Sequence, residues 1–247
     1  MRNIWTIAKR EYNLYFISPV AYVVAFLFLT IVGLIFSINL VMLSLNQFGF
    51  APAPDPRSVT SPMAFLMLLA IPALTMRLVA DEVRMGTMEL LLTAPVRDHE
   101  LVVGKWLGAF LFMLTLIAAS LVFPLMMHQV SDPGIDQMLM MSGYLGLILL
   151  TAAFLALGVG ISAIFSNQIA AFFATMVMFV ILWWLIGAPA NILPGGSDFF
   201  RQLDMSAHFY QDFNEGRITL AGIAYYLSLT VLGLVIGTTA IETRRWR

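Results

Sequence analysis

Long apolar stretches alternate with short polar segments along the whole chain. About 20 consecutive apolar residues let a helix cross the ~30 Å hydrocarbon core of a membrane. Six stretches are long enough, and they cover residues 20–45, 61–79, 101–127, 142–165, 169–188 and 218–241. Because backbone groups in lipid must find hydrogen bonds within their own segment, such stretches form helices. The pattern predicts an all-α integral membrane protein with a single transmembrane domain over residues 1–247.

The segment ahead of the first stretch, residues 1–18, is amphipathic. At 100° per residue its polar side chains share one arc of a helix, and they are Arg2, Asn3, Thr6, Lys9, Arg10 and Asn13. Aromatic and apolar side chains, among them Trp5 and Tyr12, fill the remainder, which suits the headgroup layer of a membrane. We therefore expect an N-terminal interfacial helix that ends at Ser18-Pro19.

Glu11 breaks this pattern because it lies in the middle of the apolar arc. A carboxylate buried there without a partner would be costly. We predict that Glu11 pairs with a cation from the polar segment after the second stretch, either Arg77 or Arg84. The alternative is that Glu11 reaches water along a wide polar face.

The polar segment between the second and third stretches, residues 77–105, is the most charged part of the chain. It holds nine of the 27 charged residues (13 basic and 14 acidic): Arg77, Asp81, Glu82, Arg84, Glu89, Arg97, Asp98, Glu100 and Lys105. Residues 81–93 predict a helix, with acidic residues in the first turn and Pro95 beyond its end. Met85, Met88 and Leu92 form one apolar stripe, suited to an adaptable contact with a partner protein. An ordinary loop helix is the alternative.

The distribution of Lys and Arg sets the expected orientation. The side of the N-terminus carries ten: Arg2, Lys9, Arg10, Arg77, Arg84, Arg97, Lys105, Arg244, Arg245 and Arg247. The other side carries three: Arg57, Arg201 and Arg217. Both termini and the segment 77–105 are therefore expected in the cytoplasm.

The longest extracytoplasmic segment, residues 189–217, contains two short amphipathic pieces, 198–203 and 206–215. Their apolar side chains include Phe199, Phe200, Phe209 and Phe213. The pattern predicts a helical hairpin at the membrane surface. Whether it gates a pathway or only shields the ends of the spans stays open at this point.

Composition and motifs exclude several classes of function. The chain is 60% hydrophobic and 11% charged, against about 25% charged in soluble domains, and its net charge of -1 offers no basic face for nucleic acid. Cysteine is absent, and the three histidines have no ligand spacing. Gly104-Lys105 precedes Trp106 and lacks the upstream glycine of a phosphate-binding loop. We expect no catalytic residue, metal or cofactor in this chain; an intramembrane enzyme is the weakest alternative.

Three motifs, taken together, resemble those of ABC-2-type transporter permeases. The pattern GT-x-E-x-LL-x-x-P followed by E-x-x-x-GK is matched by Gly86-Thr87, Glu89, Leu91-Leu92, Pro95, Glu100 and Gly104-Lys105. The gliding-motility (GldF-like) branch is the most similar, since it carries two further motifs. They are matched by Lys9-Arg10-Glu11 with Ser18-Pro19-Val20-Ala21-Tyr22, and, with one departure in spacing, by Ser206, His208-Phe209, Phe213, Gly216 and Ile218.

The resemblance implies a type V exporter-like fold, in which a cytoplasmic coupling helix over residues 81–93 docks into a separate ATPase. Carried over, the ATPase-coupling residues are Arg84, Met85, Gly86, Met88, Glu89 and Leu92, flanked by Lys9, Arg10 and Glu11 of the interfacial helix. Residues 189–217 correspond to a re-entrant hairpin that closes an outer gate, with Phe199, Phe200, His208, Phe209 and Phe213.

The resemblance also implies the partners. The chain would be the permease subunit of an exporter in the cell inner membrane and would form half of the pathway. Two copies of an ATPase subunit would bind ATP and Mg, and a second permease chain, identical or not, would complete the pathway. The branch further suggests a membrane-anchored auxiliary subunit with a large extracytoplasmic domain. The alternative is a scaffold of the same fold that transmits ATPase motion to an extracytoplasmic complex and moves no substrate.

Overall fold

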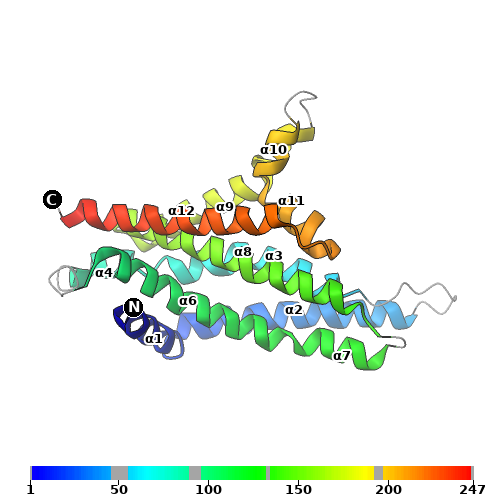
Figure 1. Ribbon diagram of the computed structural model, residues 1–247. Helices are drawn as coiled ribbons and strands as arrows, with labels where there is room; N and C mark the ends of the chain where they lie inside the picture. The colour runs from blue at the N-terminus through cyan, green and yellow to red at the C-terminus, as the bar shows by residue number, and fades with distance from the viewer. Residues whose placement is uncertain (1, 46–54, 89–95, 132–133, 192–196, 246–247) are drawn as a thin grey trace.

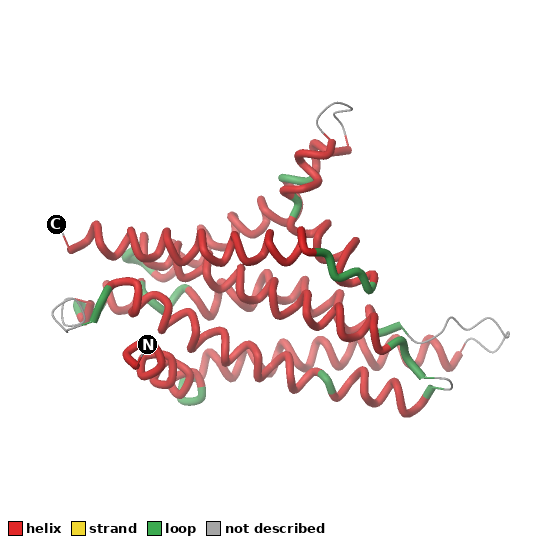
Figure 2. Tube along the Cα trace, viewed as in Figure 1, coloured by secondary structure: helices red, strands yellow, loops and turns green. Residues whose placement is uncertain are grey.

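The computed structural model describes residues 2–45, 55–88, 96–131, 134–191 and 197–245. Every regular element in these residues is helical, and the long helices lie side by side in an elongated bundle (Figures 1 and 2). Six helical spans in this part of the chain are long and apolar enough to cross a membrane. The prediction of an all-α membrane protein with six spanning helices is confirmed.

The elements differ in length and regularity along the chain. The first half contains α1 (Arg2–Tyr15), α2 (Pro19–Leu45), α3 (Arg57–Thr75), α4 (Ala80–Arg84), α6 (Asp98–Ser120) and α7 (Val122–Val130). The second half contains α8 (Gln137–Ile164), α9 (Gln168–Val180), η1 (Ile181–Leu185), η2 (Ala188–Asn191), α10 (Ser197–Leu203), α11 (Met205–Ala207), η3 (His208–Asp212), η4 (Phe213–Glu215) and α12 (Leu220–Arg245).

Most spans differ by a few residues from the predicted boundaries, and for two of them the cause is local. Helix α3 covers Arg57–Thr75 instead of residues 61–79, because Asp55 accepts a hydrogen bond from the Arg57 backbone N–H at 2.9 Å and starts the helix early. The third span extends to Val130 as two helices, α6 and α7. The break falls after Ser120, whose carbonyl has no partner four residues on because Pro124 lacks an N–H.

Helix α8 is the centre of the bundle, and most of its residues are buried. It lies between α6 and α12 in Figure 1 and also packs on α3 and α9. Small residues allow these close crossings: a Cβ at Gly158 would lie 2.6 Å from Oγ1 of Thr75 in α3. At the end of α8, the Arg244 guanidinium donates hydrogen bonds to the carbonyls of Ala163 and Ile164, at 3.1 and 2.8 Å. This contact ties α12 to α8 through otherwise unpaired carbonyls.

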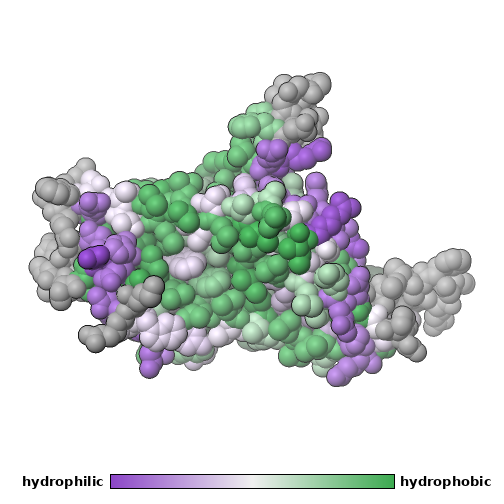
Figure 3. Space-filling view, in the orientation of Figure 1, coloured by the Kyte–Doolittle hydropathy of each residue, from purple (hydrophilic) through white to green (hydrophobic). Residues whose placement is uncertain are grey.

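Apolar side chains form a belt around the middle of the molecule, and polar residues gather at its two ends (Figure 3). Several outer side chains of α2, α9 and α12 are large, apolar and exposed, including Phe26, Phe173 and Val231. Such a surface is stable against lipid or another apolar chain but not in water.

One end of the bundle brings together α1, α4 and the last turns of α12 (Figure 1). The other end carries the break into α7 and the short elements from η2 to η4, with α10 projecting away from the bundle (Figure 1). Both chain ends therefore lie at the same end of the molecule as the charged segment. An even number of spans requires this arrangement.

Candidate functional site

Helix α1 lies directly on α6, with little more than backbone between them. A Cβ at Gly104 would lie 2.7 Å from Cβ of Ile7, and a Cβ at Gly108 would lie 2.6 Å from Cβ of Glu11. Ala8, between these two contacts on α1, is fully buried. The two glycines therefore form a groove on α6 into which α1 fits, and no larger residue is compatible with this crossing.

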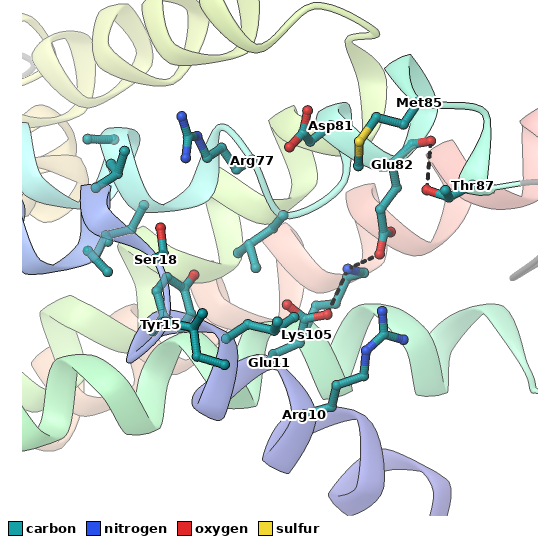
Figure 4. Close-up of a pocket in the computed structure, with 17 residues that line it drawn as sticks. Arg10, Glu11, Tyr15, Ser18, Arg77, Asp81, Glu82, Met85, Thr87 and Lys105 are labelled. Atoms are coloured by element: carbon teal, nitrogen blue, oxygen red, sulfur yellow. Dashed lines mark hydrogen bonds and ion pairs between the residues drawn. The ribbon is translucent and has the colours of Figure 1, made fainter.

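Lys105 lies beside this groove and joins three helices (Figure 4). Its ammonium donates to Oε1 of Glu11 in α1 at 3.1 Å and to Oε1 of Glu82 in α4 at 2.8 Å. The Lys105 side chain is only 2% exposed, and those of Glu11 and Glu82 are 10% and 14% exposed. We call these three residues the Lys105 cluster. Because charges in a weakly polar interior interact strongly, this cluster links α4 to α1 and α6.

The prediction that Glu11 needs a basic partner was right in kind but wrong in residue. Glu11 is buried, so the alternative of a solvent-exposed carboxylate is wrong as well. Its partner is Lys105, because the crossing of α1 over α6 brings these two side chains together. Arg84 instead pairs with Asp81 at 3.1 Å, and Arg77 is exposed.

A second polar contact fixes the start of α6 to α1. Oε2 of Glu100 accepts a hydrogen bond from the Arg97 backbone N–H at 3.2 Å and another from Nδ2 of Asn3 at 3.1 Å. The first of these bonds caps the N-terminus of α6. Glu100, Gly104 and Lys105, the three residues of the E-x-x-x-GK pattern, thus all hold α1 on α6.

Helix α4 is much shorter than the helix predicted over residues 81–93. It covers Ala80–Arg84, and Gly86 follows with a φ of +72°, in the left-handed region that ends helices. Helical geometry resumes at Thr87, whose hydroxyl donates to the Glu82 carbonyl at 3.3 Å. The prediction of one uninterrupted helix over residues 81–93 is therefore wrong: Met85 and Gly86 make a turn that exposes the end of α4.

This turn divides the residues of the predicted partner contact. Arg84 and Met85 are exposed, Met85 by 59%, and Gly86 is exposed beside them. Met88 is only 4% exposed and packs in the core, so it does not form a surface stripe with Met85 as predicted. The break at Gly86 is the cause, because it rotates the following residues away from the face of α4.

Four further predicted residues belong to this end of the chain's fold. Glu89 and Leu92 lie outside the described residues, so their assignment stays a prediction. Lys9 and Arg10 are exposed on the polar face of α1, beside the buried Glu11.

The five predicted hairpin residues at the opposite end divide into two groups. Phe209 and Phe213 are fully buried, and a Cβ at Gly146 of α8 would lie 2.6 Å from Cβ of Phe213. Phe199 is 63% exposed and Phe200 is half-buried on the projecting α10. His208 connects the groups, since its Nε2 lies 2.9 Å from the carbonyl of Gln202, in hydrogen-bond contact.

The sequence pattern did not predict the buried polar contact that Asn214 makes. It is 4% exposed, accepts a hydrogen bond from the Thr60 hydroxyl at 2.6 Å and donates one to the Ser61 hydroxyl at 2.9 Å. These bonds join the start of α3 to η4, more than 150 residues later. No short-range pattern marks such a pair; the only sequence signal is an amide among apolar residues, next to Phe213.

The described residues contain no group of three or more His, Asp or Glu side chains arranged to hold a metal ion. The Lys105 cluster is a buried ionic site at one polar end of the molecule. Its ionic contacts join α1, α4 and α6.

Over residues 5–241, the sequence matches the protein family described as "ABC-2 family transporter protein". No curated protein matches the chain.

Proposed function

Since this chain belongs to the ABC-2 family of transporter membrane proteins, we propose that it is a permease subunit, driven by a separate ATPase that docks at the exposed end of α4. The observation that carries this proposal is the Lys105 cluster, which connects α4 to α1 and α6 through buried ionic contacts. A docking partner needs such a connection for its motion to reach the spanning helices.

The transmission of force follows from the contacts. Arg84 and Met85 project from α4 and are accessible to a cytoplasmic partner. A push on α4 moves Glu82, and the 2.8 Å contact with Lys105 passes the displacement to α6. Lys105 also holds Glu11, so the interfacial helix α1 moves together with α6. Gly86, Glu89 and Leu92 complete the proposed contact, as the motif suggests.

The partners in this proposal are two ATPase subunits, which bind ATP and Mg, and a second permease chain. The exposed apolar surface of α2, α9 and α12 is compatible with such a pairing in the membrane. The motifs shared with the gliding-motility branch support a further membrane-anchored auxiliary subunit. The Lys and Arg distribution supports an inner-membrane location with both termini in the cytoplasm.

At the opposite end, we assign the elements from η2 to η4 to an outer gate. Phe209 and Phe213 anchor the segment on α8, while α10 carries Phe199 and Phe200 away from it. An anchored base with a projecting arm can move without disturbing the packing of the spans.

Co-purification with a candidate partner ATPase tests the docking site. We expect Met85→Asp to abolish co-purification, because it places a charge in the contact, while Phe199→Asp at the other end leaves it unchanged. Both side chains are exposed, so neither substitution disturbs the core. Unchanged association of the Met85→Asp variant would contradict the proposal.

Transport itself needs a second assay. Vesicles containing permease and ATPase are tested for ATP-dependent movement of a labelled compound. Movement supports an export pathway, whereas ATP-dependent changes in an extracytoplasmic partner without any movement support the scaffold function.

A further inference from the structure

A cavity of about 630 Å³ opens beside the Lys105 cluster, between α1, the start of α2, the end of α3 and α4 (Figure 4). Its volume lies within the range of about 300–1,000 Å³ typical of ligand-binding pockets. The cavity is at the level where α2 begins at Pro19 and α3 ends at Thr75. It therefore lies at the edge of the apolar belt, where lipid headgroups meet the protein.

The wall of this cavity is amphipathic. Leu14, Ile17 and Val20 form an apolar side, and Ile17 is 74% exposed. Arg10 and Arg77 line the polar side, and neither forms an ion pair with another described residue. The cavity thus offers two available guanidinium groups next to an apolar surface, a combination suited to a phosphate carried on hydrocarbon chains.

Six charged side chains face the cavity, and their signs balance. The cations are Arg10, Arg77 and Lys105, and the anions are Glu11, Asp81 and Glu82. Lys105 holds both glutamates, and Asp81 binds Arg84 and Gln168. A ligand with both a negative and a positive group therefore fits this balance better than one with a negative group alone.

Two buried polar atoms of the cavity lining have no hydrogen-bond partner. Among the described residues, the hydroxyl of Tyr15 and Oε2 of Glu82 are the buried side-chain atoms in this state, and both residues line this cavity. Burial, and to a smaller extent the nearby Glu11 carboxylate, raises the pKa of the Tyr15 phenol, so the hydroxyl stays protonated and can donate. Unpaired buried groups in native proteins call for a specific partner. In this cavity the two unpaired atoms are a hydrogen-bond donor, the Tyr15 hydroxyl, and an acceptor, Oε2 of Glu82.

We propose that this cavity binds the headgroup of an aminophospholipid of the phosphatidylethanolamine type. The phosphate binds the Arg77 guanidinium and accepts a hydrogen bond from the Tyr15 hydroxyl, while Arg10, on the opposite side of the cavity (Figure 4), adds electrostatic attraction. The primary ammonium donates to the Glu82 carboxylate, and the acyl chains follow Ile17 and Val20 into the bilayer. This site requires no ATPase and belongs to the chain by itself.

The chemistry separates this ligand from other lipids. Phosphatidylcholine carries a quaternary ammonium without an N–H, so it cannot donate to Glu82. Phosphatidylglycerol has no cation and adds a negative charge to a balanced site. The preference for a primary ammonium is therefore the signature of the proposed site.

The test uses the full chain, purified in detergent and titrated with phosphatidylethanolamine, phosphatidylcholine and phosphatidylglycerol of identical acyl chains. Bound lipid is counted by native mass spectrometry, and the rise in unfolding temperature gives an independent measure of binding. We expect the ethanolamine lipid to bind at least tenfold more tightly than the other two. Equal binding of all three, or a preference for the glycerol lipid, overturns the proposal.

Matched variants locate the site. Arg77→Gln is expected to weaken binding of the ethanolamine lipid by about tenfold, as for a lost charged hydrogen bond, and Tyr15→Phe by a few-fold. The controls are Lys9→Gln, an exposed cation of α1 outside the cavity, and Tyr12→Phe, a half-buried tyrosine of the same helix. Equal losses in variants and controls overturn the assignment. If Arg77→Gln leaves lipid binding unchanged but abolishes co-purification of the ATPase, the cavity belongs to a protein interface and the lipid proposal is wrong.

Discussion

The ammonium of Lys105 lies 2.8 Å from Oε1 of Glu82, although the two residues are 23 positions apart and belong to different helices. Since Lys105 also binds Glu11, one buried cation serves two carboxylates. A buried ion pair contributes little net stability compared with well-packed apolar side chains, but removing one member leaves an uncompensated charge. The structural and the coupling roles of the cluster can therefore be separated by mutation.

Loss of the cation alone is expected to destabilise the protein strongly. Lys105→Met leaves Glu11 and Glu82 buried without a counter-charge, and breaking such a contact typically costs about 3–5 kcal/mol. The measurement is thermal unfolding of the purified chain in detergent. Arg84→Met is the control, because this exposed cation pairs at the surface and its loss changes stability by less than about 1 kcal/mol. Similar unfolding temperatures for both variants would contradict the prediction that Lys105 neutralises two buried carboxylates.

Replacement of the whole cluster is expected to separate folding from coupling. In the triple variant Glu11→Met, Glu82→Met, Lys105→Met no charge remains buried, so stability returns close to that of the unmodified chain. The rigid ionic contact between α4 and α6 is lost, so ATP hydrolysis by the bound ATPase no longer drives movement of the spans. The movement is measured by cross-linking, or by fluorescence energy transfer between labels on α4 and α6, with and without ATP. A triple variant with unchanged ATP-dependent movement rules out the proposed route of force.

The groove on α6 predicts a steric effect at one glycine. In Gly108→Ala the new Cβ would lie 2.6 Å from Cβ of Glu11 and 2.9 Å from the Ala8 carbonyl. Because both neighbours belong to a packed helix, α1 must shift, at a cost of about 1–3 kcal/mol. Protease cleavage within α1 should become faster. Gly33→Ala is the control, since its nearest neighbour is the movable ring of Phe123 at 3.2 Å, and its α1 should stay protected.

Gly86 predicts a purely conformational effect. Nothing lies within 4 Å of a Cβ placed there, but its φ of +72° costs a side-chain-bearing residue roughly 1 kcal/mol or more. Gly86→Ala is expected to reorient the end of α4 and to weaken ATPase association several-fold. Gly86→Asn should have a smaller effect, because asparagine tolerates the left-handed region. Binding curves with the purified ATPase give the affinities of the two variants. If the alanine variant binds the ATPase as tightly as the asparagine variant, the turn assignment is wrong.

Asn214 predicts a stability effect at the opposite end. Asn214→Leu removes the hydrogen bonds to Thr60 and Ser61, so the buried Thr60 hydroxyl keeps only its 3.4 Å contact with the Pro56 carbonyl, at a cost of about 1–3 kcal/mol. The loss is measured by thermal unfolding. Asn39→Leu is the matched control, because that side chain only donates to a carbonyl of its own helix, that of Ile35. If both variants unfold alike, Asn214 does not hold η4 on α3.

The sequence predicts the helices well because hydrocarbon leaves the backbone no alternative. Runs of apolar residues locate the spans, and the 100° periodicity of residues 1–18 locates an amphipathic helix. Pro124 marks the division of the third span once the missing N–H is considered. These features depend on neighbours within a few residues of one another.

The contacts of the site depend on how helices cross, and that information is not local. The apolar arc of α1 shows that Glu11 needs a cation, but the choice of Lys105 over Arg77 follows from the groove made by Gly104 and Gly108. The composition of residues 81–93 favours one helix, whereas the single Gly86 divides it. Met88 is consequently in the core instead of on the surface.

The contact between Glu11 and Lys105 spans 94 positions, and this separation sets an order of events during synthesis. Helix α1 leaves the ribosome first, but the glycine groove and the lysine that complete its environment are made only when the third span emerges. Until then Glu11 lacks the lysine that pairs with it. This end of the molecule therefore closes late in membrane insertion, and a pause in translation before residue 105 would leave α1 exposed to proteases and chaperones.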